Sequence, residues 1–224
     1  MRHELQLDGW IITTDNSAGI GEKPLDAVKA PAFITAKFAA RVALLEQWAA
    51  GSEPQAVLLQ NFSGASQWGR YIAGIEELFE EAGLDLIPIT GSSETNMETL
   101  QSGIAVTMLG KRVRDIGYSD LQWFAYGMPL AGDEVLKNID QIADLKKIHG
   151  AVQQKMISRL WPVGSKGIAA EVELMMGKAV SVTADLDLVA SGGPAASVLI
   201  GIREEKVEAA KEYLGEPFYP LFFK

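Results

Sequence analysis

Residues 13–23 of the chain read TTDNSAGIGEK, and they directly follow the short apolar run Trp10-Ile11-Ile12. The apolar run is typical of a half-buried strand, and the polar residues after it predict a loop that begins where this strand ends. The loop would carry a carboxylate, two flexible glycines and a lysine, which together make a candidate site for a metal ion and phosphate groups. Ordinary turns use the same residue types, so the stretch by itself also fits a plain turn.

The composition describes a folded protein without a large cationic surface. The 224 residues are enough for one large domain or two modest ones. Hydrophobic residues make up 48% of the chain and charged residues 22%, a mixture that excludes a disordered chain. The net charge of -9 argues against a surface for double-stranded nucleic acid, which needs clustered Lys and Arg. A local basic site for a small anionic ligand stays open.

The residue types that the chain lacks exclude further classes of site. There is no cysteine, which excludes disulfides, thiolate nucleophiles and cysteine-bound zinc or iron–sulfur centres. The two histidines, His3 and His149, are too far apart in the sequence to suggest an imidazole metal site. No apolar run approaches the ~20 residues that span a bilayer, and the first residues lack the features of a secretion signal. We therefore expect a cytoplasmic protein that binds neither membranes nor nucleic acid.

The first half of the sequence alternates strand and helix patterns. Helices are predicted where apolar residues recur at helical spacing, and strands where short apolar runs lie between turn residues. The predicted strands cover residues 10–14, 55–62, 84–90 and 103–109, and the predicted helices cover residues 32–50 and 70–82. The order β-α-β-α-β-β indicates one α/β unit of about 110 residues, which is within the usual size of a domain.

The second half has a different pattern, which begins with an aromatic-rich strand at residues 121–126. A helix is predicted to begin at residues 132–134. Further helices are predicted at residues 141–148, 167–176 and 203–214, and strands at residues 179–183 and 197–202. The boundary between the halves is placed within residues 110–119, where Lys111, Arg112 and Arg114 form a basic run that we interpret as a charged linker.

Residues 64–71, GASQWGRY, have the glycine spacing of a phosphate-binding loop. Arg70 stands where that motif needs Lys, and Tyr71 stands where it needs the small hydroxyl that holds magnesium. Because both diagnostic side chains are replaced, we interpret the stretch as a tight connection from a strand to a helix.

Residues 90–97, TGSSETNM, follow an apolar strand directly. A loop of Gly and hydroxyl residues offers unhindered backbone donors to phosphate oxygens, and Glu94 is able to bind a hard cation through its carboxylate. A polar connection to the next strand would have the same composition.

The helix predicted at residues 32–50 carries three charged residues, Lys37, Arg41 and Glu46, on an otherwise apolar segment. Lys37 and Arg41 are four residues apart and share a face, so both cations can point at one anion. Surface side chains that extend to solvent would give the same pattern.

The order of these segments resembles a known superfamily. The residues that carry the resemblance are Thr14-Asp15-Asn16, Gly19-Ile20-Gly21-Glu22-Lys23, Gly51-Ser52-Glu53-Pro54, Gly91-Ser92-Ser93-Glu94-Thr95 and Gly103-Ile104-Ala105-Val106. They resemble the aminoimidazole ribonucleotide synthetase-like (PurM-like) superfamily of ATP-dependent enzymes, which typically show a TDG…GVGTK loop, an ND pair upstream of GAEP, and a GGET or GGDT loop. Residues 35–46 and 89–92 look most like the branch described as alpha-ribazole kinase, or alpha-ribazole-5'-phosphate synthase, of cobalamin salvage. The resemblance covers residues 10–110 and is looser beyond them, where it rests on residues 164–168 and 191–195.

The resemblance implies a two-domain α+β fold that uses ATP and Mg2+ as cofactors. Residues 1–112 would form an N-terminal ATP-binding domain with the β-α-β-α-β-β order, and this domain would pair with its copy in a homodimer. Residues 113–224 would form a smaller C-terminal α+β domain.

The same resemblance assigns site residues one by one. Asp15 falls on the first metal-binding aspartate, Glu46 on the aspartate of the ND pair, where Leu45 replaces the asparagine, and Glu94 on the acidic residue of the GGET loop. The residues assigned to the metal are therefore Asp15, Glu46 and Glu94. The residues assigned to the nucleotide are Asn16, which falls on the glycine after the aspartate, together with Gly19, Gly21, Gly91, Ser92, Ser93 and Thr95. Ser92 and Ser93 depart from the glycines of the family loop.

The implied activity is phosphoryl transfer from ATP to the 5'-hydroxyl of a small riboside, alpha-ribazole, in which the protein contributes mainly positioning and charge neutralisation. Lys23, with Lys37 or Arg41, would offset charge on the transferring group. The residues available for an apolar wall against the riboside base are Trp68, Trp123, Phe124 and Met128. Three alternatives stay open: another kinase or synthetase of the same superfamily, a non-catalytic nucleotide-binding dimer, and an unrelated α/β domain.

Overall fold

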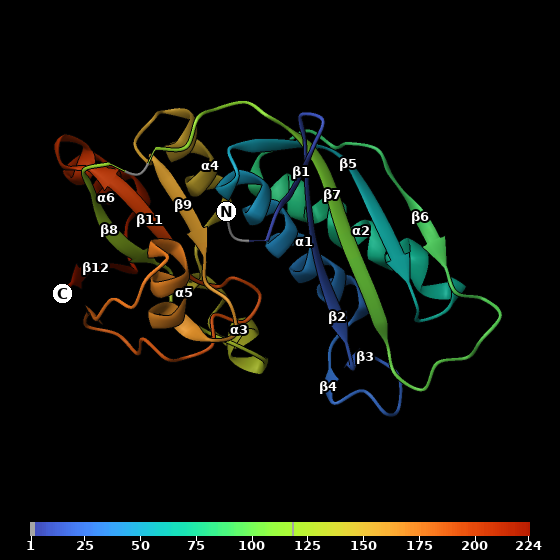
Figure 1. The fold of residues 1–224 in the computed structure, drawn as a ribbon. Helices are drawn as coiled ribbons and strands as arrows, with labels where there is room; N and C mark the ends of the chain where they lie inside the picture. Colours follow the sequence, from blue (N-terminus) through green and yellow to red (C-terminus); the bar gives the residue numbers. More distant parts are fainter. Residues whose placement is uncertain (1–2, 118) are drawn as a thin grey trace. The chain divides into compact units, whose positions relative to one another are not determined.

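The computed structural model describes residues 3–117 and 119–224 (Figure 1). The chain divides into two compact units, one formed by His3–Arg114 and one by Asp115–Lys224. The division falls directly after Arg114, two residues after the predicted boundary at residue 112. The basic run was interpreted as a linker, but Lys111 and Arg112 are the last two residues of a strand that ends at Arg112. Among the helices of the described residues, none has the length and apolar character that a membrane span requires.

The N-terminal unit is built on a five-stranded sheet in the order β1-β2-β7-β5-β6. These strands are β1 (Leu5–Leu7), β2 (Trp10–Ala18), β7 (Gly103–Arg112), β5 (Ser52–Asn61) and β6 (Ile89–Ser93). Neighbouring strands are antiparallel except β5 and β6, which are parallel. Two short parallel strands, β3 (Ile20–Gly21) and β4 (Val28–Lys29), form a separate small sheet between β2 and the first helix.

Two helices cover one face of this sheet (Figure 1). Helix α1 (Ala32–Ala49) packs on β2, β5 and β7, and helix α2 (Trp68–Ala82) packs alongside α1. A Cβ atom on Gly74 of α2 would lie 2.1 Å from the carbonyl oxygen of Phe33, so the glycine allows the two helices to approach closely. Helix α2 ends at Gly83, where φ is +69° and the amide of Leu84 donates to the carbonyl of Phe79, as in a glycine C-cap.

The layer between α1 and the sheet combines apolar packing with a few satisfied polar groups. Val57, Val106 and Met108 are fully buried beneath α1. The Thr13 hydroxyl donates to the Ala43 carbonyl at 2.8 Å, and the Gln47 side-chain amide donates to the Met108 carbonyl at 2.9 Å. These bonds tie α1 to β2 and β7, so the strand residues that alternate with Thr13 are fixed toward the helix face.

Two of the sequence-based predictions for this unit were wrong about where strands end. The first strand was predicted over residues 10–14, but β2 continues to Ala18 because β7 pairs with every residue from Trp10 to Ala18. The predicted loop at residues 91–93 is instead the end of β6, which pairs with β5 at residues 59–61. Polar residues in both places resemble loops by composition, but the neighbouring strands satisfy their backbone groups.

The C-terminal unit contains a second five-stranded sheet, in the order β10-β12-β8-β11-β9, with antiparallel neighbours. Its strands are β8 (Leu121–Tyr126), β9 (Arg159–Pro162), β10 (Val182–Thr183), β11 (Val198–Arg203) and β12 (Phe218–Phe223). Its helices are α3 (Asp133–Lys137), α4 (Leu145–Gln153), α5 (Gly167–Met176) and α6 (Val207–Leu214). Short 3-10 turns occur at η2 (Ile139–Gln141) and η3 (Glu204–Lys206), and a third, η1 (Ala65–Gln67), precedes α2 in the N-terminal unit.

The structure confirms the strand at residues 121–126 and the helix at residues 167–176. The helix predicted at residues 141–148 was misplaced, because Asp144 caps the helix by accepting from the Lys147 amide and α4 begins only at Leu145. Strands β9 and β12 were not predicted. The sequence of β12, FYPLFF, contains a proline, which counts against a strand in sequence patterns.

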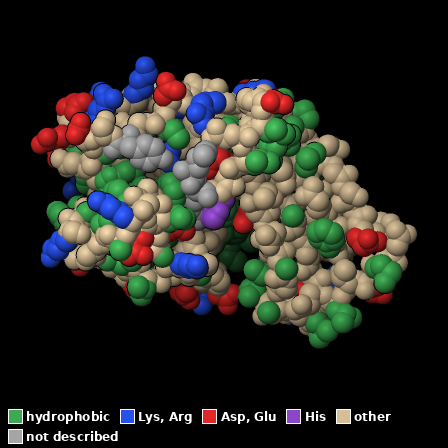
Figure 2. All heavy atoms as spheres, in the orientation of Figure 1, with side chains coloured by type: hydrophobic (Ala, Val, Ile, Leu, Met, Phe, Trp, Pro, Cys, Tyr) green, Lys and Arg blue, Asp and Glu red, His purple; other side chains and the backbone are tan. Residues whose placement is uncertain are grey.

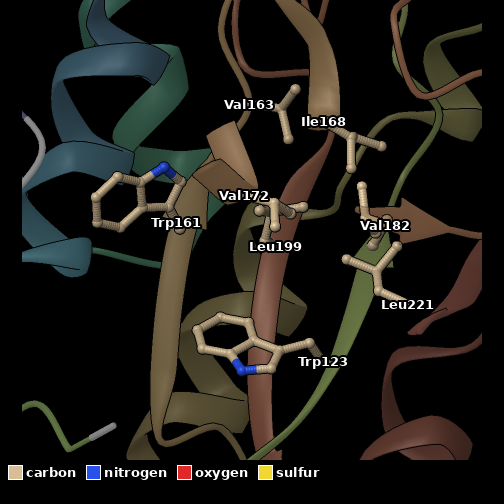
Figure 3. Packing of buried hydrophobic residues seen from close by; sticks show 9 residues of the cluster. Trp123, Trp161, Val163, Ile168, Val172, Val182, Leu199 and Leu221 are labelled. Atoms are coloured by element: carbon tan, nitrogen blue, oxygen red, sulfur yellow. The ribbon is translucent and has the colours of Figure 1, made fainter. Parts of the chain in front are cut away.

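One hydrophobic core cluster of the C-terminal unit lies between α5 and its sheet. Figure 3 shows Val172 of α5 next to Leu199 of β11, with Trp123 and Trp161 beside them. Phe124, on the opposite side of β8 from Trp123, packs against Phe218 with ring centroids 4.6 Å apart. Trp123 and Phe124 are 7% and 6% exposed, so these two of the four predicted wall residues belong to the core. The other two, Trp68 and Met128, are partly exposed.

Candidate functional site

A cavity of about 380 Å³ lies within the N-terminal unit. Its lining comes from three segments that are distant in the sequence: the loop around residue 23, the connection from β5 to α2, and the connection from β6 to β7. The lining residues are Lys23, Ser63, Gly64, Ala65, Glu94, Thr95, Asn96, Met97 and Glu98. Three residues assigned from the sequence, Lys23, Glu94 and Thr95, therefore meet at one cavity.

The connection from β5 to α2 is held by the last residue of β5. Asn61 is buried, and its side-chain amide donates to the Gly64 carbonyl and to the Ser93 hydroxyl, each at 2.9 Å. Its side-chain oxygen accepts from the Ser63 amide at 2.8 Å. This network fixes Gly64 at φ +103°, in a conformation that favours glycine, immediately before η1 and α2.

Ser63 forms a rigid part of the cavity wall. Its hydroxyl oxygen accepts from the Tyr71 hydroxyl at 2.7 Å and from the Gly103 amide at 3.0 Å. Burial raises the pKa of Tyr71, although the bond to Ser63 opposes the shift, so the phenol stays protonated as a donor. Because its hydroxyl is already bonded to Tyr71 and Gly103, we assign Ser63 a structural role in the cavity wall.

Glu94 organises the connection from β6 to β7. Its amide donates to the Asn61 carbonyl at 2.8 Å, and one carboxylate oxygen accepts from the amides of Asn96 and Met97 at 2.7 and 3.1 Å. The bond from Asn96, followed by that from Met97, lowers the pKa of Glu94. The carboxylate is therefore ionised and stabilises its own turn beside the cavity.

Lys23 is the cation among the cavity-lining residues of the described chain. Its ammonium donates to the backbone carbonyl of Thr99 at 2.7 Å and to the Thr99 hydroxyl at 2.6 Å. The Thr99 hydroxyl also lies 2.7 Å from the Phe62 carbonyl, so this one residue joins Lys23 to the end of β5. The ammonium is thus held at the edge of the cavity by neutral oxygen acceptors.

The carboxylate of Asp26, a residue that was not predicted from the sequence, fixes the loop that carries Lys23. Asp26 is 6% exposed, and it accepts from the Ser102 amide and hydroxyl, each at 2.7 Å, and from the Lys23 amide at 2.8 Å. Burial alone would raise the pKa of Asp26, but the bonds from Ser102 and Lys23 and the charge of Lys29 together lower it. The signal for this role in the sequence is no more than an acidic residue close to the glycine loop.

The two glycines assigned to phosphate binding have structural roles in the loop itself. Gly19, at φ +70°, donates its amide to the Ser102 carbonyl at 2.9 Å. A Cβ atom on Gly21 would lie 2.3 Å from the Ser102 hydroxyl oxygen and 2.8 Å from an Asp26 carboxylate oxygen. Both glycines therefore let the loop approach Ser102 and Asp26.

Asp15 and Asn16 lie next to each other in β2 and point to opposite faces of the sheet. Asp15 alternates with Thr13 and faces α1, whereas Asn16 is exposed on the other face. Neither residue lines the cavity. These two assigned residues therefore do not share the cavity lining with Lys23 and Glu94.

Gly91, Ser92 and Ser93 belong to β6, in the sheet. A Cβ atom on Gly91 would lie 1.8 Å from the Leu59 carbonyl oxygen, which explains the glycine by strand packing. Ser93 accepts from Asn61 and supports the cavity wall from behind. Of this motif, Glu94 and Thr95 reach the cavity.

The three charged residues of α1 are placed away from the cavity lining. Lys37 forms ion pairs with Glu77 at 2.9 Å and Glu81 at 2.6 Å, both on α2. Burial alone would lower the pKa of Lys37, but these two partners raise it. Arg41 and Glu46 are 1% and 3% exposed in α1.

No three acidic or histidine side chains converge to hold a metal ion anywhere in residues 3–117 and 119–224. Neither Asp15 nor Glu46 lines the cavity, and Glu94 already accepts from two backbone amides. The residues present do not fit a magnesium site made by these three carboxylates.

No known protein family matches the sequence, and no curated protein does. The fold, however, is shared with solved structures. The structure described as the HypE–HypF complex aligns with a TM-score of 0.66 and 14% identity, covering 97% of this chain and 86% of that chain. Thiamine monophosphate kinase from Aquifex aeolicus aligns with a TM-score of 0.63 and 14% identity, covering 89% and 81%. HypE in complex with ATP aligns with a TM-score of 0.61 and 13% identity, covering 95% and 74%.

At these identities the likeness shows the fold alone. The chain has the mixed α+β, PurM-like fold that the sequence resemblance implied, and the alignment extends across both of its units.

Proposed function

We propose that the chain binds ATP at the cavity and uses it in phosphoryl transfer to a small molecule. The observation that carries the proposal is the meeting of the Lys23 ammonium with Gly64 and Ala65, which begin the helical segment of η1 and α2, at one cavity. The start of a helix presents unpaired amides and the positive end of the helix dipole, which favour phosphate. The fold gives separate support, because one solved structure that shares it is described as a complex with ATP.

In the proposed reaction the acceptor hydroxyl oxygen attacks the terminal phosphorus of ATP. A new P–O bond forms, the bond between this phosphorus and the bridging oxygen breaks, and ADP leaves with the electron pair. The proton of the acceptor hydroxyl is released to solvent. Catalysis of this kind relies on positioning and charge stabilisation. Lys23 would stabilise charge on the transferring group, while Glu94 and Thr95 form another part of the cavity lining.

Magnesium supplies charge neutralisation to the polyphosphate when it is bound. Since the described carboxylates do not gather into a three-residue site, no step of this proposal passes through an ion held by them.

For the acceptor we propose the 5'-hydroxyl of alpha-ribazole. The support is the sequence resemblance of residues 35–46 and 89–92. The predicted wall residues Trp123 and Phe124 lie in the core of the C-terminal unit and do not enter this proposal.

We further propose that two copies pair through the sheet face opposite α1. Leu5 and Leu7 are 58% and 56% exposed on this face, and they neighbour Ile12 and Trp10 by strand register. In the part of Figure 2 that shows the strands of this unit, charged side chains are sparse. A homodimer would remove this apolar surface from water. Molar mass from light scattering tests the pairing, and Leu7→Asp should yield monomers.

The test of function is ADP formation by the purified protein with ATP and magnesium, with and without alpha-ribazole, with the product identified by mass. The proposal expects ADP and a phosphorylated riboside together only when alpha-ribazole is present. Lys23→Met should lower the rate at least tenfold, whereas Lys178→Met, a matched change at an exposed lysine of the C-terminal unit, should not.

Three results would redirect the proposal. Turnover with a different acceptor would keep the kinase and reject alpha-ribazole. Binding of ATP without turnover of any acceptor would indicate a nucleotide-binding dimer. Absence of nucleotide binding would reject the proposed function.

A further inference from the structure

We propose that Asp26 is the residue that positions Lys23 at the cavity. The inference rests on the proposed function, in which Lys23 is the cation that meets phosphate. Asp26 does not line the cavity, so its effect passes through Lys23 and not through contact with a ligand.

The geometry links Asp26 to two segments that are far apart in the chain. One carboxylate oxygen accepts from the Ser102 amide, and the other accepts from the Ser102 hydroxyl and the Lys23 amide. Ser102 follows Asp26 by 76 residues and directly precedes β7. The carboxylate therefore fastens the Lys23 backbone to the end of a central strand of the sheet.

A carboxylate suits this position because all three of its partners are donors. An asparagine has the same shape, but its NH2 group would replace the carboxylate oxygen that accepts from both the Lys23 amide and the Ser102 hydroxyl. A donor would then face these two donors. An ionised acceptor also forms stronger bonds than a neutral one. Asp26→Asn should thus release the Lys23 amide without a large change in volume.

The backbone bond at Asp26 complements the side-chain bonds at Thr99. The Lys23 ammonium reaches Thr99, and the neighbouring Gln101 side chain donates to the Leu25 carbonyl at 2.7 Å. The loop of Lys23 is thereby tied to residues 99–102 at both its backbone and its side chain. Without the backbone tie, the bonds to Thr99 and Gln101 would still hold this loop, but the position of the ammonium at the cavity would be less fixed.

The first experiment measures binding of the non-hydrolysable analogue AMP-PNP with magnesium by calorimetry. It compares the wild type, Asp26→Asn, Lys23→Met and the double variant, with Asp85→Asn as a control at an exposed aspartate of the same unit. Asp26→Asn should weaken binding by about tenfold, as expected when one bond to a charged group is lost. In the Lys23→Met background the same change should have almost no further effect, because the two residues act as one unit.

Equal losses in both backgrounds would overturn the proposal, because Asp26 would then act independently of Lys23. Unchanged affinity in Asp26→Asn would overturn it as well. If Asp26 only stabilised the fold, Asp26→Asn would lower the free energy of unfolding in both backgrounds, and its effect on AMP-PNP affinity would add to that of Lys23→Met.

The second experiment needs no nucleotide and separates this inference from the proposed function. Hydrogen exchange at the Lys23 amide should be about tenfold faster in Asp26→Asn than in wild type and unchanged in Asp85→Asn. If the wild type does not bind AMP-PNP, the proposed function fails, while exchange still decides whether Asp26 holds Lys23. If Asp26→Asn does not fold, Asp26→Glu, which keeps the charge and displaces it by one methylene, takes its place. Unchanged exchange at Lys23 in that variant would overturn the inference.

Discussion

The variant Gly21→Ala tests whether Gly21 is required by the fold or by a bound ligand. The Cβ atom of Gly21→Ala would lie 2.3 Å from the Ser102 hydroxyl oxygen and 2.6 Å from the Ser102 Cβ atom. The Ser102 side chain would have to move, so its bond of 2.7 Å to Asp26 would be lost. A hydrogen bond to a charged group contributes about 1.5–3 kcal/mol, and we expect the free energy of unfolding to fall by this amount.

The assay is urea denaturation of the protein without nucleotide, with hydrogen exchange used to assign the loss to the N-terminal unit. Gly69→Ala is the matched control, because no atom lies within 4 Å of its added Cβ and the residue is in the first turn of α2. This control should be neutral or more stable by about 0.5–1 kcal/mol, from helix propensity. If Gly21→Ala kept full stability without nucleotide and lost only nucleotide affinity, the glycine would serve the ligand, and the structural account of this loop would be refuted.

Three further predictions concern side chains around the site. Lys37→Met should leave AMP-PNP affinity unchanged in calorimetry, because the Lys37 ammonium is paired with Glu77 and Glu81. The free energy of unfolding should fall by at most about 1 kcal/mol, since both glutamates are exposed to solvent. A large loss of affinity would place Lys37 in the site. Tyr71→Phe should lower the free energy of unfolding by about 1 kcal/mol, as one buried bond to Ser63 is lost, and unchanged stability in urea would contradict that bond. The pKa of Asp26 is lower in the folded protein than in the unfolded chain. The ionised carboxylate therefore stabilises the fold fully above its unfolded-state pKa of about 3.9, and this stabilisation is lost as the pH falls through the folded-state pKa. The stability difference between wild type and Asp26→Asn should therefore be constant from about pH 8 to 5 and shrink below about pH 4, and a difference that shrinks with rising pH would have the wrong sign.

The sequence predicted the helices of the N-terminal unit well because their signals are local. Helix α1 begins at the predicted residue, and helix α2 ends at the predicted glycine. The apolar periodicity of a helix and its C-terminal glycine lie within one stretch of chain, so they can be read without knowledge of the partner elements.

The polar strand ends could not be read in this way. Residues 14–18 of β2 and residues 91–93 of β6 are rich in Ser, Thr, Asn and Gly, which are typical of loops. Their strand conformation depends on β7 and β5, which lie far away in the sequence. Long-range pairing therefore decided these elements against local composition.

The residues around the cavity also show that local sequence does not reveal contacts between distant segments. Lys23 and Glu94 were assigned from motifs, but the stretch at residues 64–71 was set aside because Arg70 and Tyr71 do not match a phosphate loop. What that connection offers is backbone geometry at the start of a helix, which side-chain identity does not report. Asp26 was missed because its partner, Ser102, is 76 residues away.

The hydrogen bonds that Lys23 already makes affect how the cavity can bind phosphate. Its ammonium already donates to the carbonyl and the hydroxyl of Thr99, so a phosphate exchanges these bonds for new ones instead of adding bonds to a free cation. The gain is the difference between neutral acceptors and a charged acceptor, since charge-assisted bonds are roughly twice as strong. The nearby carboxylates of Glu94 and Glu98 oppose an anion and reduce that gain. A phosphate group alone should therefore bind weakly, and most of the affinity for a nucleotide must come from the rest of the molecule and from cations that it brings with it.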